Sequence, residues 1–212
     1  IDIAADFLDQ PVARIRQRFP LLVTRPIVAD FTTGFDMPAD IPAGRRAAFF
    51  PGSTIGSLDR AEAAALLRRM CGHVGRQGKA IIGVDLRKDI RTLIAAYDDG
   101  DGVTAAFNLN LLARVNRELE GNFAVECFAH EARWNERESA IEMHLVSRKR
   151  QVVSVAGRSF AFAEGETIHT ESSRKYDIRG FTEVARHAGR RDAAVWSDPA
   201  DRFAVFGLDR ET

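Results

Sequence analysis

The sequence predicts an α/β protein in which helices cover a largely parallel sheet, with an α+β segment inserted into it. Short apolar runs alternate with amphipathic segments over residues 1–87, and this alternation resumes over residues 176–212. Between these parts, residues 88–175 change first to longer helical patterns and then to a period of two. Alternating strands and helices form parallel sheets, whereas a period of two is typical of antiparallel hairpins. We therefore expect an α/β core (1–87 and 176–212) and an inserted domain (88–175).

The segment around which the rest is arranged is residues 47–57, which read AAFFPGSTIGS. Its first four residues form a short apolar run, typical of a strand buried on both faces. The small and hydroxyl-bearing residues that follow are typical of a loop where an α/β sheet binds a ligand, at the carboxyl end of a strand. An ordinary turn between strand and helix explains this loop equally well.

The other core elements follow from the same patterns. Residues 4–15 have the spacing of an amphipathic helix, which Pro11 should break or kink. Asp59 and Glu62 form a capping-box pattern at the start of a second helix, which should end at Gly75 or Gly78. A third helix is expected to end around residue 189. The expected strands share short apolar runs: residues 1–3, 21–31, 79–86, 193–196 and 202–208.

In the inserted domain, helices are predicted from residue 88 to about residue 133, interrupted by the turn at residues 98–102. Antiparallel hairpins are predicted from residue 139 to residue 176, one of them turning at Lys149 and Arg150. The aspartates at 98–102 do not follow the ligand spacing of an EF-hand calcium loop, so we expect a turn there and no metal.

Composition limits the possible partners. The net charge is zero, which gives no field to attract nucleic acid or an anionic membrane. Cys71 and Cys127 lie far apart and form no CxxC pair, so neither a disulfide framework nor a zinc ribbon is expected, and we predict no metal. No apolar run reaches the length of a membrane span, and no signal peptide is visible. We expect a cytoplasmic protein with a small-molecule substrate.

Acidic residues at two expected strand ends suggest an adenosine cofactor. Asp2 follows the first apolar residue and is placed to accept hydrogen bonds from ribose hydroxyls. Asp30 and Phe31 end the next expected strand, where the carboxylate could accept a hydrogen bond from the adenine amine. Capping of a strand end explains each residue alone, but together on successive strands they favour an adenosine ligand.

Three further polar side chains are candidates for substrate binding. Tyr97 lies on the apolar face of a predicted helix, where core packing is the simpler interpretation. Glu171 and Ser173 are two residues apart on a predicted strand, so their side chains project to the same face. A solvated strand face is the alternative interpretation of this pair.

Several longer motifs resemble one family, the S-adenosylmethionine-dependent histidine N-alpha-methyltransferases of ergothioneine biosynthesis. The matching segments are FFPGSTIG at 49–56, GVDLRKD at 83–89, AYDDGDGVTAAFNLN at 96–110, NREL at 116–119 and TESSRK at 170–175. The resemblance implies a class I, Rossmann-like methyltransferase sheet with an inserted substrate-binding domain. It also implies S-adenosyl-L-methionine as cofactor and methylation of the alpha-amino group of L-histidine to trimethylhistidine.

The resemblance also implies a role for each candidate residue, while no catalytic base is assigned. Asp2 looks like the acid that binds the ribose, and Asp30 and Phe31 like the pair beside the adenine. Tyr97 looks like the tyrosine that holds the substrate carboxylate. Glu171 and Ser173 look like the pair that binds the imidazole ring of the substrate. Phe107 and Met143 lie where the family lines the substrate pocket.

The sequence departs from the family in two places. Ser57 stands where the family has an asparagine that binds the amino-acid end of the substrate, and a serine offers one donor instead of two. The chain also begins at Ile1 in what reads as the end of a strand, without the family's glycine-rich cofactor turn. We therefore expect an N-terminal part to be missing and these 212 residues alone to be poorly active or inactive.

These departures leave two alternatives open. The first is a methyltransferase of the same family that acts on a different amino acid or amine, as Ser57 suggests. The second is a binding or regulatory protein that keeps the fold without the activity.

Overall fold

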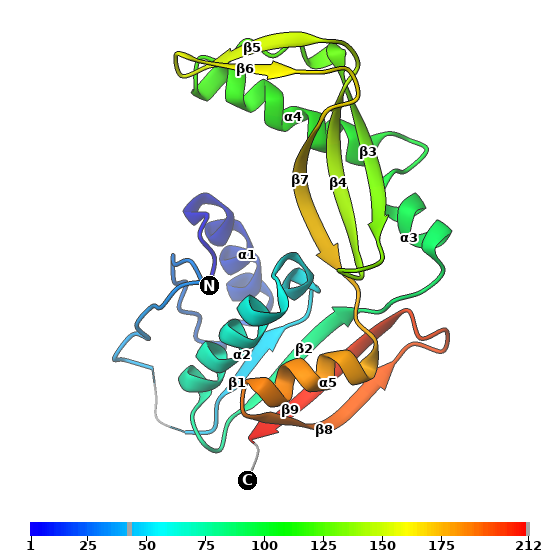
Figure 1. Cartoon of the computed structure of the whole chain (residues 1–212). Helices are drawn as coiled ribbons and strands as arrows, with labels where there is room; N and C mark the ends of the chain where they lie inside the picture. The colour runs from blue at the N-terminus through cyan, green and yellow to red at the C-terminus, as the bar shows by residue number, and fades with distance from the viewer. Residues whose placement is uncertain (42–43, 211–212) are drawn as a thin grey trace.

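The computed structural model of the chain describes residues 1–41 and 44–210 (Figure 1). Its main sheet has four strands in the order β1-β2-β9-β8. β1 runs parallel to β2, whereas β9 runs antiparallel to both β2 and β8. The sheet is therefore mixed, and its antiparallel part is the C-terminal hairpin. The strand bounds are β1 (Ala47–Phe50), β2 (Lys79–Asp85), β8 (Arg190–Ser197) and β9 (Phe203–Arg210).

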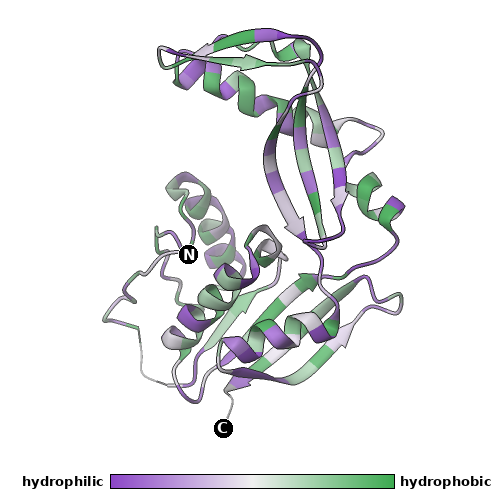
Figure 2. Cartoon of the chain, in the orientation of Figure 1, coloured by the Kyte–Doolittle hydropathy of each residue, from purple (hydrophilic) through white to green (hydrophobic). Residues whose placement is uncertain are grey.

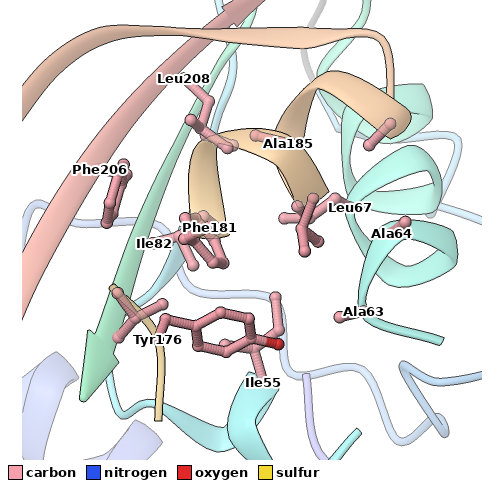
Figure 3. Close-up of a cluster of buried hydrophobic side chains, with 14 of the residues drawn as sticks. Ile55, Ala63, Ala64, Leu67, Ile82, Tyr176, Phe181, Ala185, Phe206 and Leu208 are labelled. Carbon is pink, nitrogen blue, oxygen red and sulfur yellow. The ribbon is translucent and has the colours of Figure 1, made fainter. Parts of the chain in front are cut away.

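Two helices, α2 (Arg60–Val74) and α5 (Ile178–His187), pack against each other and against this sheet. The predicted capping box is confirmed at the start of α2, where Asp59 and Glu62 each accept a hydrogen bond from the other's backbone N–H. Leu67 from α2, Phe181 from α5 and Ile82 from β2 meet in the core (Figure 3). Burial of these apolar faces stabilises the sheet and fixes the carboxyl ends of β1 and β2.

Close backbone approach joins β1 and β2 at their carboxyl ends. A Cβ atom at Gly83 would overlap the carbonyl oxygen of Pro51, so no other residue fits there without a shift. After Pro51 the chain forms a short 3₁₀ helix, η1 (Thr54–Ser57). Gly56 lets η1 approach the inserted segment, because a Cβ there would lie 2.8 Å from the carbonyl oxygen of Arg174.

The segment between β2 and α5 carries two α-helices, one short 3₁₀ helix and two small sheets. Its helices are α3 (Ile90–Tyr97), α4 (Val103–Glu118) and the short η2 (Val125–Cys127). Its larger sheet has the antiparallel order β3-β4-β7, and β5 pairs with β6 separately. These strands are β3 (Phe128–Asn135), β4 (Ala140–Ser147), β5 (Gln151–Val155), β6 (Arg158–Phe162) and β7 (Thr167–Arg174).

Hydropathy separates the two faces of the β3-β4-β7 sheet. Hydrophobic and hydrophilic residues alternate along its strands in Figure 2. Helices α3 and α4 cover the apolar face, with Leu93 packed near Ile141 and Leu112 near Leu145. The polar face, with Glu142 and His144, lies on the other side. The parallel bridge between Leu86 and Tyr176 joins the two ends of this segment, although the boundaries 88–175 stay a prediction.

Two predictions in this segment are wrong. Residues 128–133, which were expected to end the helical part, lie instead in β3, because each of them pairs with a residue of β4. Lys149 and Arg150 do turn the chain, but the strands on either side do not form a hairpin: β4 pairs with β3 and β7. Both outcomes depend on strand pairing: β4 forms a hairpin with β3, the strand before it, and pairs along its other edge with β7, so β5 pairs with β6 instead.

Residues 1–41 differ from the rest because none of their side chains is buried. Their main element is α1 (Ala5–Arg18), and a single parallel bridge joins Asp2 to Val28. The expected strands at 1–3 and 21–31 are therefore reduced to this bridge. Pro11 does not break α1, which continues through it to Arg18, although proline lacks the N–H for one hydrogen bond of the helix; the alternative outcome, a kink at Pro11, stays a prediction.

Within the part of the chain that the structure describes, no helix is both long and apolar enough to cross a membrane.

Candidate functional site

A cavity of about 440 Å³ lies where the main sheet meets the inserted segment. Four residues predicted to bind the substrate line it together: Ser57, Tyr97, Glu171 and Ser173. They come from η1, the end of α3 and β7, which are far apart in the sequence. The tertiary structure therefore brings the predicted substrate residues to one place. The wall also includes Gly52, Ser53, Thr54, Asp85 and Phe203.

Lys175, which the sequence analysis did not single out as a site residue, lies at the base of this cluster. Its side chain is 0% exposed. Its ammonium nitrogen lies 2.7 Å from the Tyr97 hydroxyl and 2.9 Å from Ser173 Oγ. It also lies 2.8 Å from Asp85 Oδ2, the carboxylate that compensates its buried charge. One signal could have found it: a lysine directly after a polar strand end and inside a family motif.

Asp85 connects this lysine to the main sheet. Its other carboxylate oxygen, Oδ1, lies 2.5 Å from the Lys88 ammonium. Its backbone N–H donates to Ser53 Oγ at 2.8 Å, which ties the end of β2 to the loop after β1. Ser53 itself has a positive φ of 57° at the start of η1. The carboxyl ends of the two parallel strands are thus joined at the cavity.

Two residues outside the cavity lining, His130 and Asn108, fix the position of Tyr97. His130 donates its Nε2 hydrogen to the carbonyl oxygen of Tyr97 at 2.7 Å. Asn108, 1% exposed, donates to the other ring nitrogen of His130 at 2.9 Å. This assigns the tautomer of His130 and fixes the end of α3. Sequence analysis missed both residues, because their contacts join α4 and β3 to α3.

Glu171 and Ser173 project from β7 towards the cavity. The carboxylate of Glu171 makes no hydrogen bond within the described part of the chain, so it is available to accept one from a ligand. Ser173 Oγ lies 2.8 Å from the Tyr97 hydroxyl. The site therefore combines one free carboxylate with two linked hydroxyl groups.

The two residues expected in the pocket wall do not line this cavity. Met143 lies directly across from Glu171 in the β4-β7 pairing. It is 5% exposed, so it is buried next to a residue of the cavity without lining the cavity itself. Phe107 is 65% exposed on α4. Their role in substrate binding stays a prediction.

The three predicted cofactor residues lie elsewhere. A separate, mostly apolar cavity of about 450 Å³ is lined by Phe31 together with Phe35, Phe49 and Phe50. The rings of Phe31 and Phe50 meet edge to face at 5.4 Å. Aromatic walls of this kind suit a flat ring such as a purine.

The two acidic residues of this group are engaged locally. Asp30 accepts hydrogen bonds from the side chain and the backbone of Thr32, which lower the pKa of its carboxyl group. Asp2 accepts one from the backbone N–H of Ala4. Neither lines the cavity of Tyr97. Asp2, Asp30 and Phe31 therefore do not line the cavity that contains Tyr97.

Within the described residues, one group could also hold a metal ion: Glu142, His144 and His169, whose ligand atoms all lie within 4.8 Å of one another. His144 Nε2 lies 3.2 Å from Glu142 Oε2, and the two imidazole rings stack at 4.9 Å. These residues lie outside the lining of the cavity described above. A hydrogen-bonded stack explains their arrangement without an ion.

Comparison with solved structures defines the class of protein. The fold is similar to that of an S-adenosylmethionine-dependent methyltransferase from Clostridium acetobutylicum, with a TM-score of 0.52, 9% identity, and 99% of this chain and 73% of that chain covered. The CcbJ methyltransferase of Streptomyces caelestis is similar to the same degree, with a TM-score of 0.52 and 12% identity over 98% of this chain and 72% of that chain. The fold is therefore that of the S-adenosylmethionine-dependent methyltransferases, and the expected fold class is confirmed.

The chain belongs to the family of SAM-dependent, histidine-specific methyltransferases, whose family model matches residues 1–210. It is 39% identical over 207 residues to the histidine N-alpha-methyltransferase of Mycolicibacterium smegmatis. It is 36% identical to that of Mycobacterium tuberculosis. Both alignments cover 96% of this chain, which spans 64% of the length of each relative. The family resemblance found in the sequence is confirmed.

Proposed function

We propose that the protein transfers a methyl group from S-adenosyl-L-methionine to the alpha-amino group of L-histidine. The observation that carries this proposal is the convergence of Ser57, Tyr97, Glu171 and Ser173 on one cavity. The names of the two mycobacterial relatives support the same reaction. We propose small-molecule substrates and no nucleic-acid partner, consistent with the net charge of zero.

Recognition of histidine would use both ends of the molecule. The free carboxylate of Glu171 accepts a ring N–H, and Ser173 contacts the other ring nitrogen. The hydroxyl of Tyr97 donates to the substrate carboxylate. Ser57 reaches less far than the family's asparagine, so its contact with the amino-acid end is weaker or passes through water.

The chemistry requires the amine to lie in line with the methyl group it receives. Bound S-adenosyl-L-methionine would supply that methyl group on a positively charged sulfur, with Asp2, Asp30 and Phe31 proposed to hold the adenosine. Fixing the amino acid through Tyr97 and Glu171 positions the nitrogen, and such positioning can supply roughly 7–11 kcal/mol of the barrier. The amine must be neutral to react. We assign no general base, because both carboxylate oxygens of Asp85 are occupied by lysines.

A second candidate is a methyltransferase of this family that acts on another amino acid or amine. Ser57, in place of the family's asparagine, is the observation that favours it. Assay of the protein, as its gene encodes it, with each amino acid and labelled cofactor separates the two.

Glu171→Ala tests the division of roles. We expect histidine methylation to fall by about 10²- to 10⁴-fold in kcat/KM, since the variant lacks the acceptor for the ring N–H. Calorimetric affinity for S-adenosylhomocysteine should stay unchanged. Glu164→Ala, in the exposed turn between β6 and β7, is the matched control and should behave as the wild type. An equal loss of cofactor affinity in Glu171→Ala would contradict the proposal.

A further inference from the structure

The ammonium group of Lys175 has three hydrogens and no acceptor. Three oxygen atoms surround it at hydrogen-bond distance: Asp85 Oδ2 at 2.8 Å, the Tyr97 hydroxyl at 2.7 Å and Ser173 Oγ at 2.9 Å. The side chain is fully buried, so water does not compete for these hydrogens. Lys175 therefore donates one hydrogen to each neighbour, and both hydroxyl oxygens act as acceptors on the side that faces it.

This arrangement restricts what the two hydroxyl groups can do towards the cavity. Each has one hydrogen of its own, and the oxygen atoms of Tyr97 and Ser173 lie 2.8 Å apart. One of the two hydrogens can bridge the pair, and the other must point away from Lys175. A ligand that accepts hydrogen bonds can turn both hydroxyl hydrogens towards the cavity, because the two oxygen atoms already accept hydrogens from Lys175 on the side that faces it.

We infer that Lys175 is a positioning residue that makes Tyr97 and Ser173 hydrogen-bond donors towards the ligand. The cavity then presents two donors and one acceptor, the carboxylate of Glu171. This set fits an amino acid whose carboxylate meets Tyr97 and whose ring offers one N–H to Glu171 and one unprotonated nitrogen to Ser173. The inference rests on the proposed function for the identity of that ring.

Lys175 also joins the two parts of the molecule. Asp85 ends β2 of the main sheet, whereas Ser173 lies on β7 and Tyr97 ends α3. Its ammonium lies 4.5 Å from the centre of the Tyr97 ring as well, which adds a cation–π contact. The orientation of the donors thus depends on the junction between sheet and insert.

The test compares the wild-type protein, as its gene encodes it, with Lys175→Met, which keeps the chain length and removes all three donors. Calorimetry in the presence of S-adenosylhomocysteine measures binding of histidine and of its pyrrole analogue, which keeps one ring N–H and lacks the second ring nitrogen. The wild type should prefer histidine by about 100-fold or more. In Lys175→Met, histidine should bind about 10- to 100-fold more weakly, and the preference should fall below about tenfold. Affinity for S-adenosylhomocysteine should not change.

Lys88→Met is the matched control. Lys88 pairs with the same aspartate but makes no contact with Tyr97 or Ser173 among the described residues. It should keep the wild-type preference for histidine. Should Lys175→Met fail to fold, Asp85→Asn loosens the anchor of Lys175 and should lower the same preference to a smaller extent. An unchanged preference in the folded variant, or an equal loss of cofactor and histidine binding, overturns the inference.

A second readout does not depend on histidine. The chain has two tyrosines, so ¹³C labelling of the ring carbon next to the hydroxyl gives two NMR signals. The Tyr97 signal, assigned with Tyr97→Phe, should move in Lys175→Met and stay in Lys88→Met. A signal that does not move overturns the inference. If the wild type fails to bind histidine and the Tyr97 signal still differs between the wild type and Lys175→Met, the inference on the two donors holds and the proposed substrate is wrong.

Discussion

The cavity of Tyr97, where we propose that the substrate binds, and residues 1–41 are built in contrasting ways. At the cavity, a fully buried Lys175 and a 1% exposed Asn108 support the residues in front of them. In residues 1–41 no side chain is buried, and Asp2 and Asp30 are held by hydrogen bonds to near neighbours in the chain. The side chains of the cavity are therefore positioned by tertiary packing, whereas the carboxylates of Asp2 and Asp30 bind near neighbours in the chain.

Helix α2 of the core and helix α1 of residues 1–41 show a similar difference. α2 begins with a complete capping box and buries six residues, among them Leu66 and Leu67. α1 begins at Ala5 after Ala4, which provides no side-chain cap; the helix contains Pro11 and buries no residue. Most helix stability in proteins comes from packing of an apolar face. An amphipathic pattern therefore predicts a helix in both cases, but only α2 has a partner for that face within the described residues.

Removing one large side chain from the core of the main sheet and one from α1 gives the largest expected difference in stability. Phe181 is 0% exposed in the core, so Phe181→Ala should lower the free energy of unfolding by about 3–5 kcal/mol. Phe7 is 76% exposed on α1, and Phe7→Ala should change it by no more than about 0.5 kcal/mol. Urea denaturation followed by circular dichroism measures both. A comparable loss in the two variants would mean that α1 packs as part of the core.

Hydrogen exchange should reveal the same contrast without mutation. Segments with few buried apolar contacts open locally at low cost in free energy. The amides of α1 should therefore exchange within the first time points, while those of β2 and β9 exchange only on global unfolding. Exchange mass spectrometry with peptide resolution measures this. Protection of residues 1–41 equal to that of β2 would contradict the comparison, and addition of S-adenosylhomocysteine shows whether the ligand orders them.

The smallest expected effect concerns the turn between α3 and α4. Hydrogen bonds from the side chain and backbone of Thr104 and from the backbone N–H of Val103 lower the pKa of Asp99 from 3.8 to about 2. Because this pKa is lower in the folded state, its contribution to stability is present above pH 3.8 and is lost as the pH falls towards 2.

Asp99→Asn keeps the shape of the turn and cannot titrate. Between pH 5 and pH 2, the Tm of the wild type should therefore fall further than the Tm of Asp99→Asn. Thermal unfolding followed by circular dichroism measures both. Parallel curves for the two proteins would show that this carboxylate does not contribute to the acid dependence.

Local patterns predicted much of the fold and of the substrate site. The capping box at Asp59 and the apolar run of β2 depend on residues close together in the chain, and both predictions are confirmed. Tyr97, Glu171 and Ser173 were found because they lie inside long motifs. In contrast, the strand at 128–135 was missed, because its pairing with the next strand, β4, decides its structure and the spacing of its own apolar residues does not. The expected strand at 21–31 is reduced to a bridge, because only Val28 of this run pairs, with Asp2, among the described residues.

The sequence alone determined the family, the alternation of strands and helices, and four of the nine residues that line the cavity of Tyr97, since these are encoded in short segments. Only the tertiary structure decided that Lys175, Asp85, His130 and Asn108 support those residues, because their contacts join elements far apart in the chain. It also decided that Phe31 and Tyr97 line separate cavities. The physical reason is that burial and hydrogen bonding between distant segments depend on how the elements pack, which no local pattern records.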